Sequence, residues 1–316
     1  MFAYRRPRRA AVRRLLRLAA RSGNDAVRVL LSVDFEDWHQ LVRRRVGAAG
    51  WSRPGPALER QTAALLALLD ELGARATFFV LGMAARSHPA LVEAIAARGH
   101  EIACHGDQHL PVLSQTPGQF AEDLRAARAT IERLTGSRPL GYRAPAFSIG
   151  EASRWAHDVL AAEGFAYDAS MHDSPRIRGR IPATGARPHA LQLERGGSLW
   201  ELPVAVWRVG SARIPVGGAS YWSVLPTALV LRGLASAGPM AGLYLHPHEL
   251  DPLPLNASVG SDAAVATRVH ARLRALQRNA ARRRAPSVLR AIAGRYRTIT
   301  YGEAYAQLSA GGDTRS

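Results

Sequence analysis

The sequence of 316 residues contains no lysine and a single cysteine, Cys104. One cysteine excludes an internal disulfide framework and any zinc site built from several thiolates. A bound metal would therefore need histidine and carboxylate ligands. All 42 basic residues are arginine, and together with 25 acids they give a formal net charge of +17. No nucleic-acid recognition motif accompanies this charge, so we do not expect nucleic acid as a partner.

Long hydrophobic runs are also absent. No apolar stretch approaches the ~20 residues that span a bilayer, and arginine interrupts every candidate signal-peptide core near the N-terminus. We therefore expect the protein in the cytoplasm or at the cytoplasmic membrane surface. Residues 1–22 carry eight arginines and no acid. We expect residues 1–26 to form a basic arm, which is either flexible or in contact with an anionic membrane surface or acidic polymer.

From Val27 onward, short β-branched or aromatic runs alternate with longer amphipathic segments, a pattern typical of a parallel sheet wrapped by helices. The predicted strands cover residues 27–33, 76–81, 100–104, 140–143, 165–168, 199–204, 243–246 and 297–300. The predicted helices cover residues 57–72, 89–98, 116–134, 148–164, 227–235 and 264–281. Capping boxes formed by Thr116 with Gln119 and by Ser148 with Glu151 predict the starts of the third and fourth of these helices. Six or more such units favour an α/β barrel. We expect one domain over 27–310 and a short tail over 311–316, with a long loop at 172–198.

Three acids stand at the end of the first predicted strand, where barrels of this kind carry reactive groups. They are Asp34, Glu36 and Asp37, within four consecutive residues. Carboxylates this close repel one another unless a cation or an arginine neutralises them. Taken alone, the cluster is equally compatible with a solvated acidic turn.

A second candidate follows the strand that ends at Cys104. His105 and His109 are four residues apart, so over one helical turn both imidazoles would face the same way and reach one metal ion. An isolated pair with this spacing is a weak indicator. Its position after a strand, in a chain with carboxylates at another strand end, favours a shared metal site.

Two further segments carry reactive groups at strand ends. In the run Gly141–Phe147, Pro145 stiffens the loop and Arg143 offers a permanent positive fork to a carboxylate. His246 ends an apolar strand, and histidine in that position is a suitable general acid. A single histidine is more often structural, so the interpretation of His246 as a general acid depends on the other three segments.

These four segments, in this order, resemble the polysaccharide deacetylase family with the NodB homology domain, also called carbohydrate esterase family 4. The runs Val-Asp-Phe-Glu-Asp-Trp, Gly-Tyr-Arg-Ala-Pro-Ala-Phe-Ser-Ile and Leu-His-Pro-x-Glu-Leu-Asp-Pro resemble the subgroup associated with exopolysaccharide gene clusters of exosortase-bearing bacteria. The resemblance covers residues 27–310. It implies a distorted (β/α)7 barrel of the NodB type.

The resemblance also implies a divalent metal held by one carboxylate and two histidines, with zinc expected first and cobalt, nickel or manganese as alternatives. His105 and His109 match the two histidines. Most members follow their catalytic base at once with a metal-binding aspartate, where this chain has Phe35. Members with an Asp-x-Asp spacing point to Glu36 as the third ligand, and Asp37 stays open as the alternative.

Catalytic roles follow from the same resemblance. Asp34 matches the catalytic base, Arg143 the arginine that orients it, and the backbone N–H of Ala146 the oxyanion donor. His246 matches the general acid. Asp168 is a looser match to the acid that tunes this histidine, and a turn or capping role fits it equally well.

The implied activity is hydrolysis of N-acetyl groups from N-acetylated sugars of a polysaccharide or oligosaccharide, with release of acetate. His248 stands where relatives often carry an aromatic residue, so we expect it to form a pocket wall. One alternative is hydrolysis of another C–N bond, in a cyclic amide or ureide, because a fold does not fix its substrate. A non-catalytic sugar-binding module is the other, and the complete set of acid, base and metal ligands argues against it.

Overall fold

The computed structural model describes residues 27–48, 50–173, 187–256, 259 and 264–312. The basic arm expected over residues 1–26 and the end of the tail, residues 313–316, lie outside the described residues. No helix in the described part of the chain combines the length and the apolar character needed to cross a membrane.

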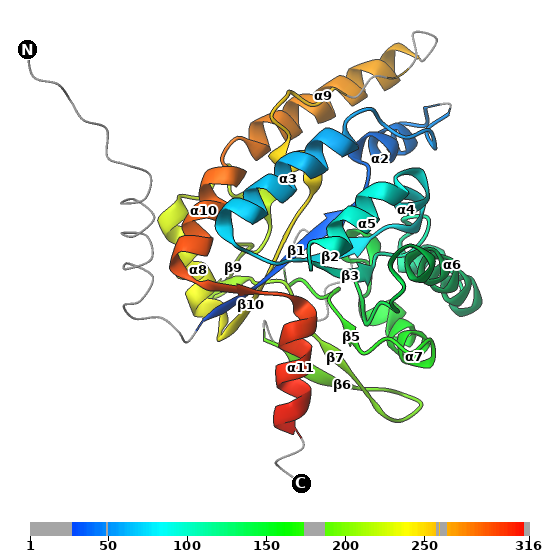
Figure 1. Ribbon diagram of the computed structural model, residues 1–316, viewed down its shortest axis with the longest axis vertical. Helices are drawn as coiled ribbons and strands as arrows, with labels where there is room; N and C mark the ends of the chain where they lie inside the picture. The colour runs from blue at the N-terminus through cyan, green and yellow to red at the C-terminus, as the bar shows by residue number, and fades with distance from the viewer. Residues whose placement is uncertain (1–26, 49, 174–186, 257–258, 260–263, 313–316) are drawn as a thin grey trace, which may run out of the picture.

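A curled sheet of nine strands forms the centre of the molecule (Figure 1). Its strands are β1 (Arg28–Phe35), β2 (Thr77–Val80), β3 (Glu101–Cys104), β4 (Gly141–Tyr142), β5 (Tyr167–Asp168), β6 (His189–Gln192), β7 (Ser198–Glu201), β10 (Met240–Leu245) and β11 (Arg297–Ile299). Their order is β10-β1-β2-β3-β4-β5-β7-β6, and β11 pairs with β1. Every pairing is parallel except that of β6 with β7. A separate hairpin joins β8 (Trp207–Val209) to β9 (Ala212–Ile214).

Single bridges join the far end of this sheet back to β10. Val204, beyond the end of β7, bridges to Gly242, and Gly218 bridges to Tyr244. The approach at Gly242 requires glycine, because an added Cβ would lie 2.3 Å from the carbonyl oxygen of Pro203. Closure by single bridges in place of a continuous ladder makes the fold a distorted barrel. The fold class expected from the sequence is therefore confirmed.

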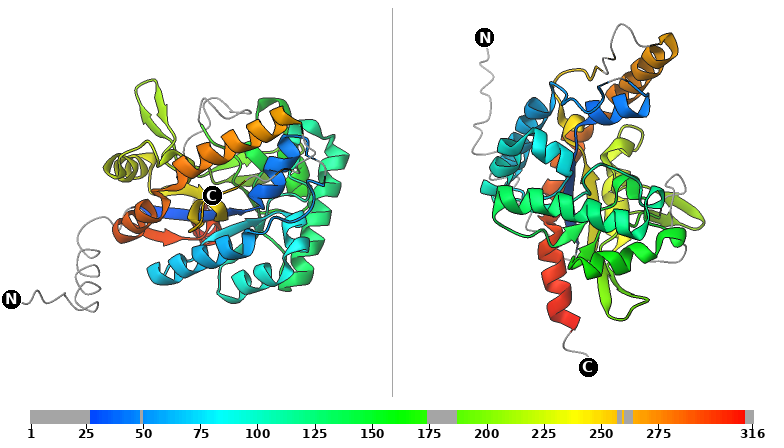
Figure 2. Two further views of the ribbon diagram at one scale, coloured as in Figure 1. Left: turned by 90° about the horizontal axis from the view of Figure 1, so that it is seen from above. Right: turned by 90° about the vertical axis from the view of Figure 1, so that its right-hand side faces the viewer.

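Helices cover the outside of the curled sheet (Figure 2), except that the last helix packs against side chains of the sheet's inner face. They are α2 (Trp38–Arg45), α3 (Leu58–Leu72), α4 (Gly82–Ser87), α5 (Pro89–Ala97), α6 (Pro117–Thr135), α7 (Trp155–Ala162), α8 (Thr227–Ala237), α9 (Val265–Arg282), α10 (Ala285–Arg295) and α11 (Tyr301–Gly312). Short 3-10 turns complete the connections: η1 (Val112–Ser114), η2 (Pro145–Phe147), η3 (Glu151–Ser153), η4 (Ala219–Tyr221) and η5 (Pro247–Leu250).

Local signals in the sequence explain some helix boundaries and fail at others. The Thr116 hydroxyl and the Gln119 side chain form the predicted capping box at the start of α6. The second capping box predicted from Ser148 and Glu151 is wrong. The Ser148 hydroxyl instead accepts the backbone N–H of Val112 at 3.0 Å, and α7 begins further along without a side-chain cap.

Alternation along the strands separates two layers of core. On β1, Val29 and Leu31 belong to the large apolar cluster that the helices cover. Leu30 belongs to a smaller cluster inside the barrel. Because successive side chains of a strand point to opposite faces, Ser32 and Asp34 share the inner face with Leu30. Strand alternation therefore directs the first candidate acid into the barrel.

Candidate active site

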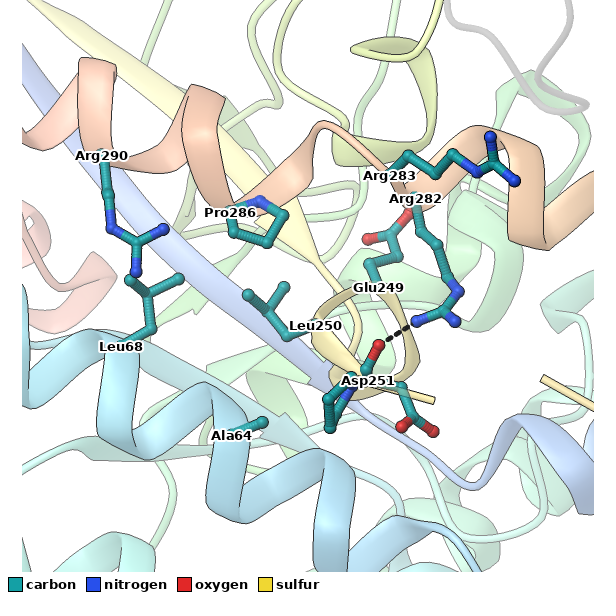
Figure 3. A pocket seen from close by; sticks show the side chains of 10 residues that line it. Ala64, Leu68, Glu249, Leu250, Asp251, Arg282, Arg283, Pro286 and Arg290 are labelled. Carbon is teal, nitrogen blue, oxygen red and sulfur yellow. Dashed lines mark hydrogen bonds between the residues drawn. The ribbon is translucent and has the colours of Figure 1, made fainter. Parts of the chain in front are cut away.

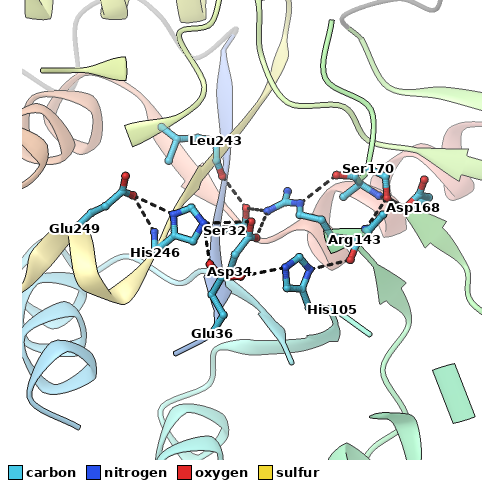
Figure 4. A network of polar contacts seen from close by, with 12 residues as sticks. Ser32, Asp34, Glu36, His105, Arg143, Asp168, Ser170, Leu243, His246 and Glu249 are labelled. Atoms are coloured by element: carbon cyan, nitrogen blue, oxygen red, sulfur yellow. Dashed lines mark hydrogen bonds and ion pairs between the residues drawn. The ribbon is translucent and has the colours of Figure 1, made fainter. Parts of the chain in front are cut away.

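The reactive side chains come from four strand ends that meet at one mouth of the barrel (Figure 4). Asp34 lies near the end of β1, His105 follows β3, Arg143 follows β4 and His246 follows β10. Carboxyl ends of parallel strands lie on the same edge of a sheet. His105 stands two residues after Ala103, which belongs to the inner cluster, so alternation directs it inward as well.

Glu36, His105 and His109 form a cluster at this mouth, which we call the mouth cluster. Each offers one ligand atom, and these atoms lie within 4.8 Å of one another. The Nε2 atom of His109 is 3.0 Å from the Oε2 atom of Glu36, and that of His105 is 3.7 Å from the same oxygen. The two candidate histidines and one candidate acid therefore lie together.

The state of the mouth cluster suits a divalent cation. The Nδ1–H of His105 donates to the carbonyl oxygen of Arg143 at 2.8 Å, which leaves the Nε2 lone pair facing Glu36, as is usual for metal-binding imidazoles. Burial opposes ionisation of Glu36, but His109 and His105 outweigh it and hold its pKa well below the ordinary value. An ionised carboxylate beside two imidazoles is a donor set that zinc and similar ions favour.

The connection between the two histidines is a bend, and the helical turn expected from their spacing is wrong. Gly106 and His109 both have positive φ, of 75° and 53°. The carboxylate of Asp123 accepts the backbone N–H groups of Asp107 and Gln108 at 2.7 and 3.1 Å. These contacts, and not helix periodicity, hold the second imidazole beside the first.

Asp37 lies outside the mouth cluster. Its carboxylate accepts the backbone N–H of His39 at 2.8 Å and that of Gly55 at 2.5 Å, and it caps the start of α2. Both oxygens are thus directed at backbone donors. Of the two acids that the sequence left open as third ligand, only Glu36 lies beside the histidines.

Arg143 holds Asp34 in one orientation. Its Nη1 atom donates to Oδ1 of Asp34 and to the hydroxyl of Ser32, both at 2.7 Å, and its Nε donates to the carbonyl of Ala169 at 3.0 Å. The guanidinium is fully buried. The other oxygen of Asp34, Oδ2, lies 4.0 Å from Nε2 of His246. One oxygen is therefore fixed while the other faces the mouth.

Glu249 is the acid that contacts His246. Its Oε2 lies 3.4 Å from Nδ1 of His246 and accepts that residue's backbone N–H at 2.9 Å, while Ser220 donates to Oε1 at 2.6 Å. Burial lowers the pKa of His246, but Glu249, Glu36 and Asp34 outweigh it and raise that pKa to about 9. The imidazole is therefore kept in its protonated form.

Sequence reasoning missed Glu249 and considered Asp168 for this contact. Figure 4 shows Asp168 on the far side of Arg143 from His246. The available signal was the position of Glu249 three residues after His246, a capping-box spacing that returns its carboxylate to the histidine backbone.

Backbone strain gathers at this site. Among the described residues other than glycine, positive φ occurs at His109, Ala146 and Phe147, at 53°, 54° and 53°. Strained backbone of this kind persists where surrounding contacts over-determine it, commonly at functional sites. Ala146 is exposed on η2, while the ring of Phe147 packs against Tyr244 with centroids 4.8 Å apart.

His248 forms a buried wall behind the acid. Its ring centroid lies 5.0 Å from that of His246 and 5.9 Å from that of Trp38. Burial lowers the pKa of His248 well below its ordinary value, so the ring is neutral and packs as an aromatic residue.

A separate pocket of about 410 Å³ lies against η5 (Figure 3). Leu68, Leu250 and Pro286 contribute its apolar lining, and Arg282 at its edge donates to the carbonyl of Asp251. The mouth cluster contributes nothing to this lining. Glu249, which contacts His246, also lines the pocket, so the pocket adjoins the site at the strand ends from the side away from the mouth cluster.

Two family models match consecutive parts of the chain: polysaccharide deacetylase over residues 52–164, and a domain of unknown function (DUF3473) over 170–285. A peptidoglycan deacetylase-like protein of Gibberella zeae is 31% identical over 169 residues, 47% of this chain and 45% of that protein. A chitooligosaccharide deacetylase of Bradyrhizobium sp. is 32% identical over 109 residues, 34% of this chain and 47% of that protein. The chain thus matches less than half the length of either relative.

Solved structures share the fold at lower identity. A Mycobacterium smegmatis protein classed with the polysaccharide deacetylases superposes with a TM-score of 0.57 at 20% identity, covering 92% of this chain and 93% of that one. A PuuE allantoinase gives a TM-score of 0.55 at 18% identity with the same coverage. At such identity the likeness establishes the barrel and nothing about substrate.

Proposed function

Because this chain belongs to the polysaccharide deacetylase family, we propose that it is a metal-dependent hydrolase that removes N-acetyl groups from sugars of a polysaccharide or oligosaccharide. One observation carries the proposal: the mouth cluster lies beside Asp34 and His246 at one end of the barrel. The names of the relatives, deacetylases of peptidoglycan or chitooligosaccharide, support the substrate class.

Glu36, His105 and His109 would hold the metal, and we propose zinc because two imidazoles and one carboxylate are a common set at catalytic zinc sites. When bound, a divalent cation supplies Lewis acidity that polarises a carbonyl group and makes water easier to deprotonate. Asp34 and His246 lie beside these three residues, with Oδ2 of Asp34 4.0 Å and Oε1 of Glu36 3.6 Å from Nε2 of His246.

Asp34 takes the proton from the attacking water. Its free oxygen faces the mouth while Arg143 and its hydrogen bonds hold the other, so the base needs no reorientation before the reaction. Arg143 is itself fixed by Ser32 and by the carbonyl of Ala169. The orientation of the base therefore depends on buried contacts that substrate does not disturb.

His246 gives its proton to the departing amine. Its raised pKa, to about 9, keeps that proton in place at neutral pH until the C–N bond breaks. The backbone N–H of Ala146, on the strained turn after Arg143, meets the oxyanion that develops on the acetyl carbonyl. One donor of this kind is typically worth about 3 kcal/mol of transition-state stabilisation.

Acetate release from N-acetylglucosamine oligomers tests the proposal. We expect Asp34→Asn to lower the rate by about 10²–10⁴-fold, the usual contribution of a general base, and His105→Ala to abolish it with loss of the metal held by the mouth cluster. Circular dichroism should show both variants folded. His270→Ala, on the exposed face of α9, is the matched histidine control and should keep full activity.

Full activity in Asp34→Asn would refute the role of that residue. Cyclic amides and ureides are the comparison substrates, because an allantoinase shares the barrel. Turnover of these compounds without acetate release from oligomers would replace the proposal by its alternative.

We also propose an exopolysaccharide as the polymer, supported by the three subgroup motifs in residues 33–38, 141–149 and 245–252. A location at the cytoplasmic membrane surface goes with this proposal. Contact between the basic arm and a membrane concerns residues outside those that the structure describes.

A further inference from the structure

A second group of histidine and carboxylates lies away from the mouth. His157 on α7, Asp168 on β5 and Glu201 on β7 each offer one ligand atom, all within 4.8 Å of one another. Their neighbours Tyr167 and Leu202 face the inside of the barrel, so alternation directs Asp168 and Glu201 outward, toward α7. We call this group the buried cluster, and the proposed reaction uses none of its members.

Each member of the buried cluster has one polar atom without a hydrogen-bond partner. These atoms are Nε2 of His157, Oδ2 of Asp168 and Oε2 of Glu201, in side chains whose residues are 5%, 0% and 0% exposed. The other carboxylate oxygens are occupied: Ser170 donates to Oδ1 of Asp168 at 2.5 Å, and the Met171 N–H donates to Oε1 of Glu201 at 3.0 Å. Buried polar atoms without partners are uncommon in folded proteins and need an explanation such as an ordered water or an ion, and here three of them converge within 4.8 Å.

The spacing of two of these atoms fits shared coordination. Nε2 of His157 and Oδ2 of Asp168 are 3.4 Å apart. Hydrogen bonds between such atoms are shorter, at about 2.7–3.2 Å. Two ligands bound tetrahedrally at about 2.0–2.1 Å from one zinc ion stand about 3.3 Å apart.

Charge gives an independent argument. Asp168 and Glu201 are fully buried, and two buried carboxylates this close repel each other unless a cation or a shared proton neutralises them. Arg143 acts on this pair only at a distance, because its guanidinium forms its ion pair with Asp34 at 2.7 Å. A dication would neutralise both carboxylates and leave His157 neutral, which is the form that binds metal.

We propose that His157, Asp168 and Glu201 bind a second divalent transition-metal ion, of the zinc class, in a closed structural site. Its three ligands are enclosed between the sheet and α7, in contrast to the mouth cluster. The site connects to the active site through Ser170, whose hydroxyl donates to Asp168 and accepts the N–H of Ala144 at 2.8 Å. The ion therefore braces the segment that carries Arg143.

Metal content of the purified full-length chain tests this site without any assay of activity. After loading with zinc and desalting, elemental analysis should give two equivalents in the wild type. The double variant His105→Ala/His109→Ala should keep one equivalent, and adding Glu201→Gln should remove it. His100→Leu is the matched control: His100 is also buried with an unpartnered Nε2, and its loss should leave two equivalents.

Glu201→Gln separates a metal from a shared proton, because glutamine is isosteric with a protonated glutamate. If the buried cluster shares only a proton, Glu201→Gln and the wild type bind equal amounts of zinc, and the proposal is overturned. No zinc in His105→Ala/His109→Ala would overturn it even if the Glu201 variant did not fold. Either result leaves the mouth cluster and its proposed reaction standing, since wild-type metal content and acetate release test those separately.

Discussion

The mouth cluster and the buried cluster both combine histidine with carboxylates, on opposite faces of one sheet. In the mouth cluster the His109 side chain is 19% exposed, and Asp34 and His246 face the same opening. In the buried cluster the His157 side chain is 7% exposed and that of Asp168 is fully covered. Open metal sites act on substrates, whereas closed ones support structure. Residue composition alone does not distinguish the mouth cluster from the buried cluster. Strand alternation does, because it places them on different faces of the sheet.

Arg143 stands between the two clusters (Figure 4). Toward the mouth it donates to Asp34, and toward the buried side it donates to the carbonyl of Ala169, the residue after Asp168. A guanidinium has donors in a fixed planar fork, so a shift of either partner changes the direction of the other hydrogen bond. Substitutions at the mouth should therefore change acetate release strongly. Substitutions on the buried side should change it weakly, through Arg143.

The largest expected effect separates Glu36 from Asp37. Glu36→Gln removes the anionic ligand beside two imidazoles, and because Lewis-acid stabilisation is worth several kcal/mol, acetate release should fall on the order of 10³-fold. Asp37→Asn keeps one oxygen to accept the N–H of His39 and loses the acceptor of the Gly55 N–H, but neither contact involves the mouth cluster, so its rate should stay within about fivefold of the wild type.

Zinc affinity measured alongside the rate decides the assignment of the third ligand. Glu36→Gln should lose the mouth equivalent and keep the buried one, while Asp37→Asn should keep both. The opposite pattern, with zinc lost only in Asp37→Asn, would place the third ligand at Asp37 and contradict the assignment of Glu36 to the mouth cluster.

An intermediate effect is expected at Glu249. Its carboxylate contributes to raising the pKa of His246, and the acid form of that histidine is lost as pH rises through this pKa. Glu249→Gln therefore lowers the pKa and moves the alkaline loss of acetate release to lower pH, with a decrease of about tenfold at pH 8. A cation bound to Glu36 cancels part of that carboxylate's influence, which leaves Glu249 as the main support.

The pH profile of kcat is the measurement, with Ser220→Ala as the comparison, because it removes the donor to the other oxygen of Glu249 and the acceptor of Arg278 but leaves the carboxylate beside His246. A profile for Glu249→Gln that superposes on the wild type would show that another group sets the alkaline limb.

Much of the barrel was predictable because its signals are local. Buried strands read as apolar runs, and the strand expected at 27–33 is observed over Arg28–Phe35. The capping box at Thr116 fixed the start of α6. Residues 172–198 were expected as a loop, yet within their described part β6 pairs with β7. That pairing depends on register with a neighbouring strand, which alternation within one segment does not reveal.

The sequence predicted which strand ends carry the residues of the site, but not which side chains contact those residues. Asp34, His105, Arg143 and His246 each follow a strand signal, so their meeting at one mouth follows from topology. Glu249 was missed because its carboxylate reaches back to its own helix start, a contact without any periodic signature. The buried cluster was missed for the opposite reason: its members come from three elements that only the folded sheet brings together.

The smallest expected effect tests the connection between the clusters. Ser170→Ala removes the hydroxyl that donates to Asp168 and accepts the N–H of Ala144. Leaving buried groups without a partner costs about 1–3 kcal/mol, so urea denaturation should show a loss of that size in the free energy of unfolding. Acetate release should fall by less than about tenfold, because Arg143 keeps its own contact with Asp34.

Ser236→Ala, at an exposed position of α8, is the control and should change the free energy of unfolding by less than about 0.5 kcal/mol. A double-mutant cycle of Ser170→Ala with Glu201→Gln then measures coupling within the buried side. If both act through one braced segment, their costs in kcat should be smaller together than added separately. Strict additivity, or a Ser170 variant indistinguishable from Ser236→Ala, would mean that changes in the buried cluster do not alter the active site.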